Sequence, residues 1–367
     1  MGKDKTRGKQ LAVAAKLILS LFLLFWISHS IFMEESRLHW EDSSLAWEDL
    51  NRGAKWSNAW TTGPDLLVRT ISQVSPTAFA LSVILMGITI LIGILRWRMA
   101  LAAQGLPLPF WRATEITFVA QFFNSFLLGS TGGDIIKAWY AARESHHKKS
   151  EAVVTVVADR IIGLFSMLVF AVIAASLNSA LFKATPAAGG VLLLVCCLLG
   201  ASTIILWFAF WHPLEDQSIA AGLINRFPAA AAIIKSLQSC REFSRRPNFL
   251  IKAFSLSTLL NVICVFQFLT LSNGLGMNVS LTAFLFVVPA VICVSALPIT
   301  PNGLGIRENL VVLMLTSTAV GADGATALSL SLLAYGGSLL WSVAGGFVYL
   351  AFKAPHHLKD FSDSSEV

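Results

Sequence analysis

Long apolar runs without charged residues constrain this chain more than any other feature of its sequence. Six such runs approach the roughly 20 residues that a helix needs to cross a bilayer. They lie at about 12–33, 78–97, 152–176, 189–211, 251–272 and 326–352. Only 13% of the 367 residues are charged, whereas a soluble domain carries about 25% charged residues. The sequence therefore predicts an all-α polytopic membrane protein and excludes a large soluble domain.

The basic residues predict how the chain is oriented. Twenty of the 27 Lys and Arg residues fall in five polar stretches, at 1–16, 96–112, 137–149, 212–252 and 353–367. Because positively charged loops remain in the cytoplasm, both termini are expected there, in a bacterial inner (plasma) membrane. Residues 1–11 form the basic N-terminus, 12–352 the transmembrane domain and 353–367 the tail. The first run is interpreted as a retained anchor rather than a cleaved signal peptide. The net charge of +6 is attributed to topology and anionic lipids, not to nucleic acid.

The polar loop 34–77 has the opposite character. Seven acidic residues outnumber four basic ones there, which predicts an external position. The loop also contains Trp40, Trp47, Trp56 and Trp60. These rings fit either an amphipathic belt at the membrane interface or the packing of a small external cap.

Two further apolar stretches, 114–130 and 281–320, are interrupted by Gly, Pro and polar residues. The first has basic loops on both sides, so it is expected to enter and leave the membrane from the cytoplasm. The second is expected to do so from outside. With about six full spans, these re-entrant hairpins give an inverted repeat, with repeat A at about 78–176 and repeat B at about 251–352. Such repeats with broken helices are typical of secondary transporters. Two ordinary full spans are the alternative.

The first hairpin contains a glycine-rich break followed by charged residues. Gly residues from 129 to 133 hold a helix poorly, and Ser130 or Thr131 can cap the helix that follows. The free N–H groups at that helix start would attract an anion such as a lipid phosphate. The lysine and the aspartate of this segment are spaced to pair. The candidate head-group residues here are Asn124, Ser130, Gly132, Gly133, Asp134 and Lys137.

The second hairpin has two Pro and two Gly residues before an Arg-Glu pair. Asn302 is predicted to cap the new helix, and an intramembrane Arg requires a partner or a water-filled cavity. A third site is predicted at Asp159-Arg160, as an ion pair inside the bundle or at a helix end. Arg96-Trp97-Arg98 is interpreted as an interfacial anchor. The candidate head-group residues of these two sites are Asn302, Gly303, Gly305, Arg307, Glu308, Asp159 and Arg160.

Motifs of soluble enzymes are absent from the sequence. There is no Walker A loop, Gly-x-Ser-x-Gly elbow, His-Glu-x-x-His motif or dinucleotide fingerprint. The five cysteines and the His pairs show no metal-ligand spacing. The sequence therefore predicts no cofactor, no metal site and no enzymatic activity.

Three blocks of residues, in this order, resemble a known family. They are Asn124 with Gly129-Ser130 and Gly132-Gly133-Asp134, Asp159-Arg160 with Gly163-Leu164, and Pro298 with Gly303-Leu304-Gly305 and Arg307-Glu308. Together they resemble the flippase-like transmembrane domain of lysylphosphatidylglycerol synthetases, over roughly 12–352, in its stand-alone form. Two differences stand out. Leu128 replaces a common Pro, and the soluble aminoacyl-transferase domain is missing, which argues against lysyl-lipid synthesis by this chain.

The resemblance implies a lipid flippase or transporter. Its partners would be membrane lipids, namely an anionic phospholipid, a hopanoid or a polyprenyl-linked lipid, with a separate lipid synthase as a further partner. Two other functions stay open from the sequence. One is a membrane-embedded transferase that uses a carboxylate such as Asp134 or Asp159 as base. The other is a non-transporting subunit of a lipid or cell-envelope synthase.

Overall fold

The computed structural model describes residues 47–126, 132–144, 148–177, 186–211, 246–297, 299–317 and 320–351, with Phe243 and some residues between 18 and 40. Throughout these residues the regular structure is helical. The predicted all-α membrane architecture is therefore confirmed.

Five helices are long and apolar enough to cross a bilayer. They are α3 (Pro76–Ala103), α6 (Lys149–Ser176), α8 (Pro186–Trp211), α11 (Pro247–Gly274) and α14 (Gly324–Ala351). They correspond to five of the six predicted runs. The remaining run, 12–33, is the first along the chain, and most of it lies outside the described residues.

Four shorter helices occupy the two interrupted stretches. α4 (Phe110–Phe126) and α5 (Gly132–Glu144) pack together, as do α12 (Leu281–Ser295) and α13 (Ile306–Leu315). The longest of them, α4, has 17 residues and measures only about 26 Å at 1.5 Å per residue, less than the thickness of a hydrocarbon core. The helix breaks therefore lie where they were predicted, and the re-entrant path through the membrane stays a prediction.

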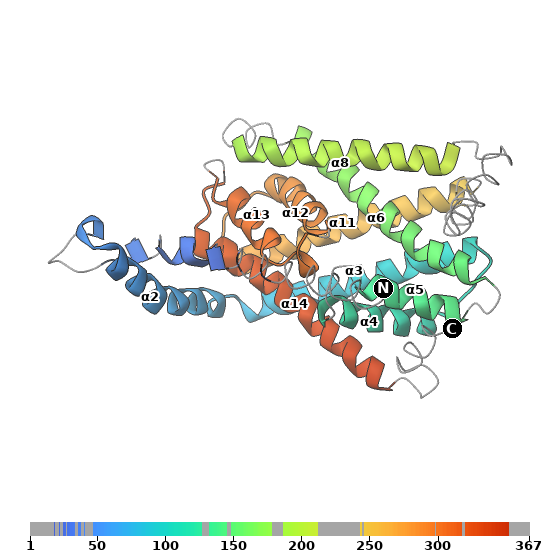
Figure 1. The fold of residues 1–367 in the computed structure, drawn as a ribbon, viewed down its shortest axis with the longest axis horizontal. Coiled ribbons are helices and arrows are strands. Elements are labelled where there is room, and N and C mark those ends of the chain that lie inside the picture. Colours follow the sequence, from blue (N-terminus) through green and yellow to red (C-terminus); the bar gives the residue numbers. More distant parts are fainter. Residues whose placement is uncertain are drawn as a thin grey trace, which may run out of the picture.

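The polar loop 34–77 contains a helix, α2 (Arg52–Ser72), which lies at the left end of the molecule in Figure 1. Asn51 caps it by accepting a hydrogen bond from Ala54 N at 2.7 Å. The indoles of Trp56 and Trp60 both donate to Nδ1 of His29, each at 3.1 Å. Two of the four rings, Trp56 and Trp60, thus pack against the chain's own N-terminal segment, and the belt and the cap both stay predictions.

Helices α3 and α11 begin and end 171 residues apart, from 76 to 247 and from 103 to 274. Each has Pro in its first turn, and each is followed by a Gly with positive φ, at Gly105 and Gly276. α4 and α12 also start 171 residues apart, at 110 and 281. The order of a long helix, two short helices and a long helix thus occurs twice.

The contacts between helices follow the same repetition. α4, from the first set, packs against α14 of the second, while α12 of the second packs against α6 of the first. α3 and α11 pack against each other, and α8 covers α6 and α12, along the top of the bundle in Figure 1. Each short helix pair is therefore enclosed by helices of both halves.

Small residues permit the close approach of α4 and α14. A Cβ on Gly345 would lie 2.1 Å from the carbonyl oxygen of Phe118. Beside this contact, the hydroxyls of Ser125 and Ser342 are hydrogen-bonded at 2.7 Å. Glycine contacts and interhelical hydroxyl bonds are the usual means by which transmembrane helices associate.

Candidate functional site

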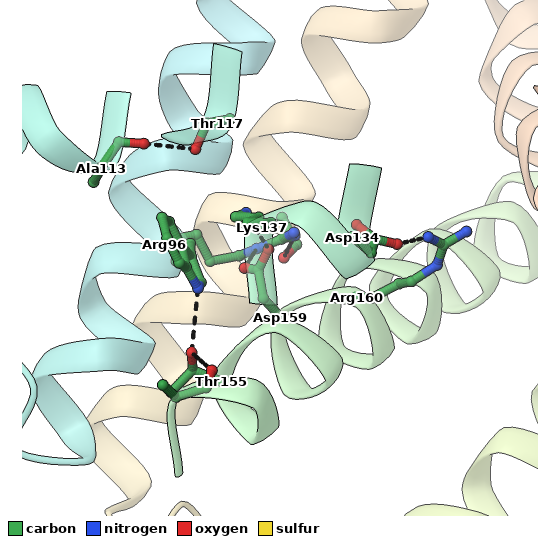
Figure 2. A network of polar contacts seen from close by, with 11 residues as sticks. Arg96, Ala113, Thr117, Asp134, Lys137, Thr155, Asp159 and Arg160 are labelled. Carbon is green, nitrogen blue, oxygen red and sulfur yellow. Dashed lines mark hydrogen bonds and ion pairs between the residues drawn. The ribbon is translucent and has the colours of Figure 1, made fainter. Parts of the chain in front are cut away.

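A buried cluster of charged side chains joins helices of both halves. Arg96 of α3 donates from Nε to Asp159 Oδ1 of α6 at 2.7 Å, and from Nη1 to Ser257 Oγ of α11 at 2.7 Å. Lys137 of α5 approaches the other carboxylate oxygen of Asp159 at 3.8 Å. Figure 2 shows Arg96, Lys137 and Asp159 between α3, α5 and α6. We call Arg96, Lys137, Asp159 and Ser257 the charged cluster.

The charged cluster contains more positive than negative charge. Arg96 is 9% exposed, and Lys137 and Asp159 are each 8% exposed, so two cations share one carboxylate away from solvent. The Lys137 ammonium also lies 4.3 Å from the ring centroid of Trp97, a favourable cation–π position. Because a buried unbalanced charge is costly, the cluster is suited to receiving an anion.

The spacing of residues on α6 explains how Arg96 is accommodated. Asp159 and Gly163 are four residues apart and therefore lie on the same helix face. A Cβ on Gly163 would lie 2.9 Å from Nη1 of Arg96, so the glycine provides the space that the guanidinium fills. The Asp159 and Gly163 of the sequence motif thus form one binding surface for Arg96.

A second ion pair lies beside the charged cluster. Arg160 of α6 pairs with Asp134 of α5, as Figure 2 shows. The side chains of both are about one-third exposed. Two sequence interpretations were wrong here. Asp134 pairs with Arg160 rather than with Lys137, and Asp159 does not pair with Arg160, because adjacent helix residues point in different directions.

The start of α5 is held by α4. Asn124 Oδ1 accepts a hydrogen bond from Gly133 N at 2.9 Å, and a Cβ on Gly133 would lie 2.1 Å from the carbonyl oxygen of Ala120. Gly132 is the first residue of α5, whereas Ser130, the predicted cap, lies outside the described residues. One of the N–H groups predicted to meet a lipid phosphate therefore already has an acceptor within the protein.

The start of α13 is held by its own glutamate. Glu308, which is fully buried, accepts from Gly305 N at 2.7 Å through Oε2. Its other oxygen, Oε1, accepts from Arg307 Nε at 3.0 Å and also from Nη2. The Arg307 guanidinium lies 4.5 Å from the ring centroid of Tyr335 on α14. The predicted partner that an intramembrane Arg requires is thus the neighbouring glutamate.

Asn302 does not cap α13, which corrects the sequence prediction. It lies in the one-turn 3-10 helix η2 (Pro301–Gly303) with a positive φ of 53°, and Gly305 precedes α13 instead. Gly303 and Gly305 also have positive φ, a conformation that glycine adopts without steric cost. These three residues with positive φ extend the turn, so the residue that precedes α13 is Gly305, three positions after Asn302.

Replacing Glu308 with Gln should destabilise the protein by about 1–2 kcal/mol, because the amide leaves the half-buried Arg307 without a charged acceptor. Thermal unfolding in detergent measures this loss. Asp323→Asn is the matched control, since Asp323 caps Thr326 N at the exposed start of α14 and Asn is an equally good cap. Equal unfolding midpoints for the two variants would contradict the role assigned to Glu308.

Arg96 is the site residue that sequence reasoning missed. The run 78–97 placed it at a helix end, as an interfacial anchor, but α3 continues to Ala103 and so carries Arg96 inside the bundle. The 171-residue offset offers a signal. At this offset Gln267 is the equivalent of Arg96, and Met86 is the equivalent of Ser257. These two residues also contact each other, with Gln267 Nε2 3.8 Å from Met86 Sδ. Of these two equivalent contacts between α3 and α11, the Arg96–Ser257 contact contains a charged side chain and the Gln267–Met86 contact does not.

Two apolar crevices lie on either side of α6, beside the residues that follow Asp159 and Arg160 in the sequence. One, of about 380 Å³, is lined by Ile162 and Phe165 with residues of α8 and α11. The other, of about 270 Å³, is lined by Ile161 and Leu164 with residues of α8 and α12. Among the described residues, no group of three or more His, Cys, Asp or Glu side chains could hold a metal ion. The arrangement therefore offers cations beside hydrocarbon-lined space.

The chain is similar in sequence to known membrane proteins. A segment of 117 residues is 26% identical to a UPF0104 membrane protein of Pyrococcus horikoshii. It covers 31% of this chain and 35% of that protein, so the chain spans about a third of this relative. Residues 54–346 match the family described as the lysylphosphatidylglycerol synthase TM region. That match begins at α2, later than the residue 12 that the sequence resemblance suggested. The chain is a multi-pass membrane protein and belongs to the lysylphosphatidylglycerol synthase TM region family.

Proposed function

We propose that this protein moves an anionic or amphipathic lipid between the leaflets of its membrane. The observation that carries the proposal is the charged cluster, in which Arg96 and Lys137 share the carboxylate of Asp159. A phosphate entering the cluster would balance the second cation, and hydrogen bonds between an ammonium and a phosphate oxygen are strengthened by the two charges. The inner membrane, the cytoplasmic termini, the lipid partners and the absence of enzymatic activity are parts of this proposal.

The surroundings of the charged cluster support a lipid rather than a soluble anion. The apolar crevices begin on α6 within two residues of Arg160, so a head group near the cations has space for acyl chains beside it. The repeated helix order further supports transport, because internal repeats with broken helices let one half move against the other around a central site.

Lys137 is the cation that we assign to the head group. Its ammonium is 3.8 Å from Asp159, whereas Arg96 binds the same carboxylate at 2.7 Å and also binds Ser257. Arg96 therefore fixes the carboxylate, and Lys137 can exchange its longer contact for a phosphate oxygen. The predicted roles of Arg307 and Glu308 change accordingly, because their mutual pairing serves the start of α13.

The test is transbilayer movement of fluorescent phosphatidylglycerol in proteoliposomes, measured by dithionite bleaching. Lys137→Met should slow the movement about tenfold, the equivalent of one phosphate contact of about 1.4 kcal/mol. Lys137→Arg, which keeps the charge, should retain most of the rate. Because Asp159 keeps its Arg96 partner in both variants, both should fold in normal yield.

Equal rates for Lys137→Met and the unmodified chain, both above protein-free liposomes, would refute the assigned role. If the unmodified chain moved no lipid at all, a non-transporting subunit would be favoured. A lipid whose mass changed on incubation with the protein would instead indicate a transferase.

A further inference from the structure

The seam between α3 and α11 differs at its two ends. At one end, Ser75 N donates to the carbonyl oxygen of Gly274 at 3.0 Å, and a Cβ on Gly274 would lie 2.5 Å from the Cβ of Ala78. The two helices are in direct contact there. The 171-residue offset makes Arg246, Phe249 and Ala103 the equivalents of Ser75, Ala78 and Gly274 at the other end.

At that other end the seam opens into a groove of about 500 Å³. Larger residues, Arg246 and Phe249, stand there at the positions equivalent to Ser75 and Ala78, and Phe249 packs with Ala103 in one buried cluster. Phe249 and Ala103 are buried in the groove wall, whereas Arg246 and Lys252 are exposed. We call this the basic groove; its lining residues are Met99, Ala102, Ala103, Arg246, Pro247, Asn248, Phe249 and Lys252.

The cations of the basic groove have no acidic partner among the described residues. Within the described part of the chain, no acidic side chain pairs with Arg246 or Lys252. Arg246 is the N-cap of α11 and Lys252 lies in its second turn, so both stand at one end of a helix long and apolar enough to cross a bilayer. Basic pockets between transmembrane helices on the cytoplasmic side bind anionic head groups.

The basic groove leads towards the charged cluster. Met99 lies about one turn from Arg96 on α3, and Lys252 lies five residues before Ser257 on α11, about 8 Å along the helix axis. An apolar crevice adjoins the same turns of α11 through Leu250, Ile251 and Phe254. Phosphate-binding cations and space for an acyl chain are thus side by side at the membrane surface.

We propose that the basic groove binds the phosphate of an anionic phospholipid from the leaflet facing that end, which the positive loops predict to be cytoplasmic. As a point of access to the charged cluster, the groove rests on the proposed transport function. The binding itself does not, because it requires only the two cations and the open seam.

Equilibrium binding to the purified full chain in detergent tests the proposal, with fluorescence anisotropy of a labelled phosphatidylglycerol as readout. Arg246→Ala/Lys252→Ala should weaken binding about thirtyfold, at about 1 kcal/mol for each cation. Ala102→Trp, which fills the groove and keeps both cations, should also weaken it. Arg52→Ala/Arg69→Ala removes the same charge from the exposed face of α2 and should leave binding unchanged.

Four results would overturn the proposal. They are unchanged binding by Arg246→Ala/Lys252→Ala, unchanged binding by Ala102→Trp, equal affinity for labelled phosphatidylcholine, and displacement of the lipid by inorganic phosphate at equal concentration. The second indicates diffuse surface charge, and the last indicates a site for a free anion. If the binding pattern held while proteoliposomes showed no lipid movement, the transport function would fail and the basic groove would stand.

Discussion

Asp159→Ala is expected to destabilise the protein by about 3–5 kcal/mol, because removing the carboxylate leaves two buried cations without a counter-charge. Among the described residues, Arg96 would keep only Ser257 as a partner, and Lys137 would keep only the ring of Trp97. The yield of monodisperse protein in detergent and its unfolding midpoint measure the effect. Glu115→Gln is the control. It removes an acid whose side chain is 45% exposed, from its pair with Arg112, and such pairs contribute about 0–1 kcal/mol.

A triple substitution separates stability from function at the charged cluster. Arg96→Met/Lys137→Met/Asp159→Leu removes every charge at once, and replacing a buried ionic group by apolar side chains of similar size is often neutral or stabilising. We expect this variant to fold like the unmodified chain and to fail in lipid movement. A triple variant as unstable as Asp159→Ala would show that the charges are required by the fold.

Gly345→Val is expected to destabilise the protein by about 3 kcal/mol or more. Its Cβ alone would lie 2.1 Å from the backbone oxygen of Phe118, so α4 and α14 would have to separate, and overpacking that moves backbone lies at the costly end of such changes. The separation would also break the Ser125–Ser342 hydrogen bond. Thermal unfolding, together with disulfide cross-linking between cysteines placed on α4 and α14, measures both effects.

Gly200→Val is the matched control for Gly345. Nothing lies within 4 Å of the position that its Cβ would take on α8, and Val favours a helix at least as well as Gly. An equal loss of stability from the two substitutions would mean that valine itself, rather than the contact with α4, is responsible.

Hydropathy and glycine patterns predicted most of the fold. The five long helices and both helix breaks lie where the apolar runs and the Gly- and Pro-rich stretches placed them. Run length could not fix the helix ends, because a helix can continue past charged residues when their charges are paired inside the protein. α3 does so, from Trp97 to Ala103, and this is why Arg96 was assigned to the interface.

The sequence predicted some residues of the candidate site, but it predicted neither the roles of Arg96 and Ser257 nor the pairings. Asp134, Lys137, Asp159, Arg160, Arg307 and Glu308 are all half-buried or buried, as intramembrane charges should be. Their partners depend on which helices become neighbours, which a single sequence does not specify. Lys137 meets Asp159 only because α5 packs on α6, and Ser257 enters only because α11 packs on α3.

The equal lengths of α3 and α11 have a consequence for motion. Each has 28 residues, so the closed and open ends of their seam could be exchanged by a small rotation of one helix against the other, without melting a turn of either. The exchange would break the Ser75–Gly274 bond and bury Phe249 more deeply, at costs that differ because the paired side chains differ. The two arrangements would therefore not be equally populated.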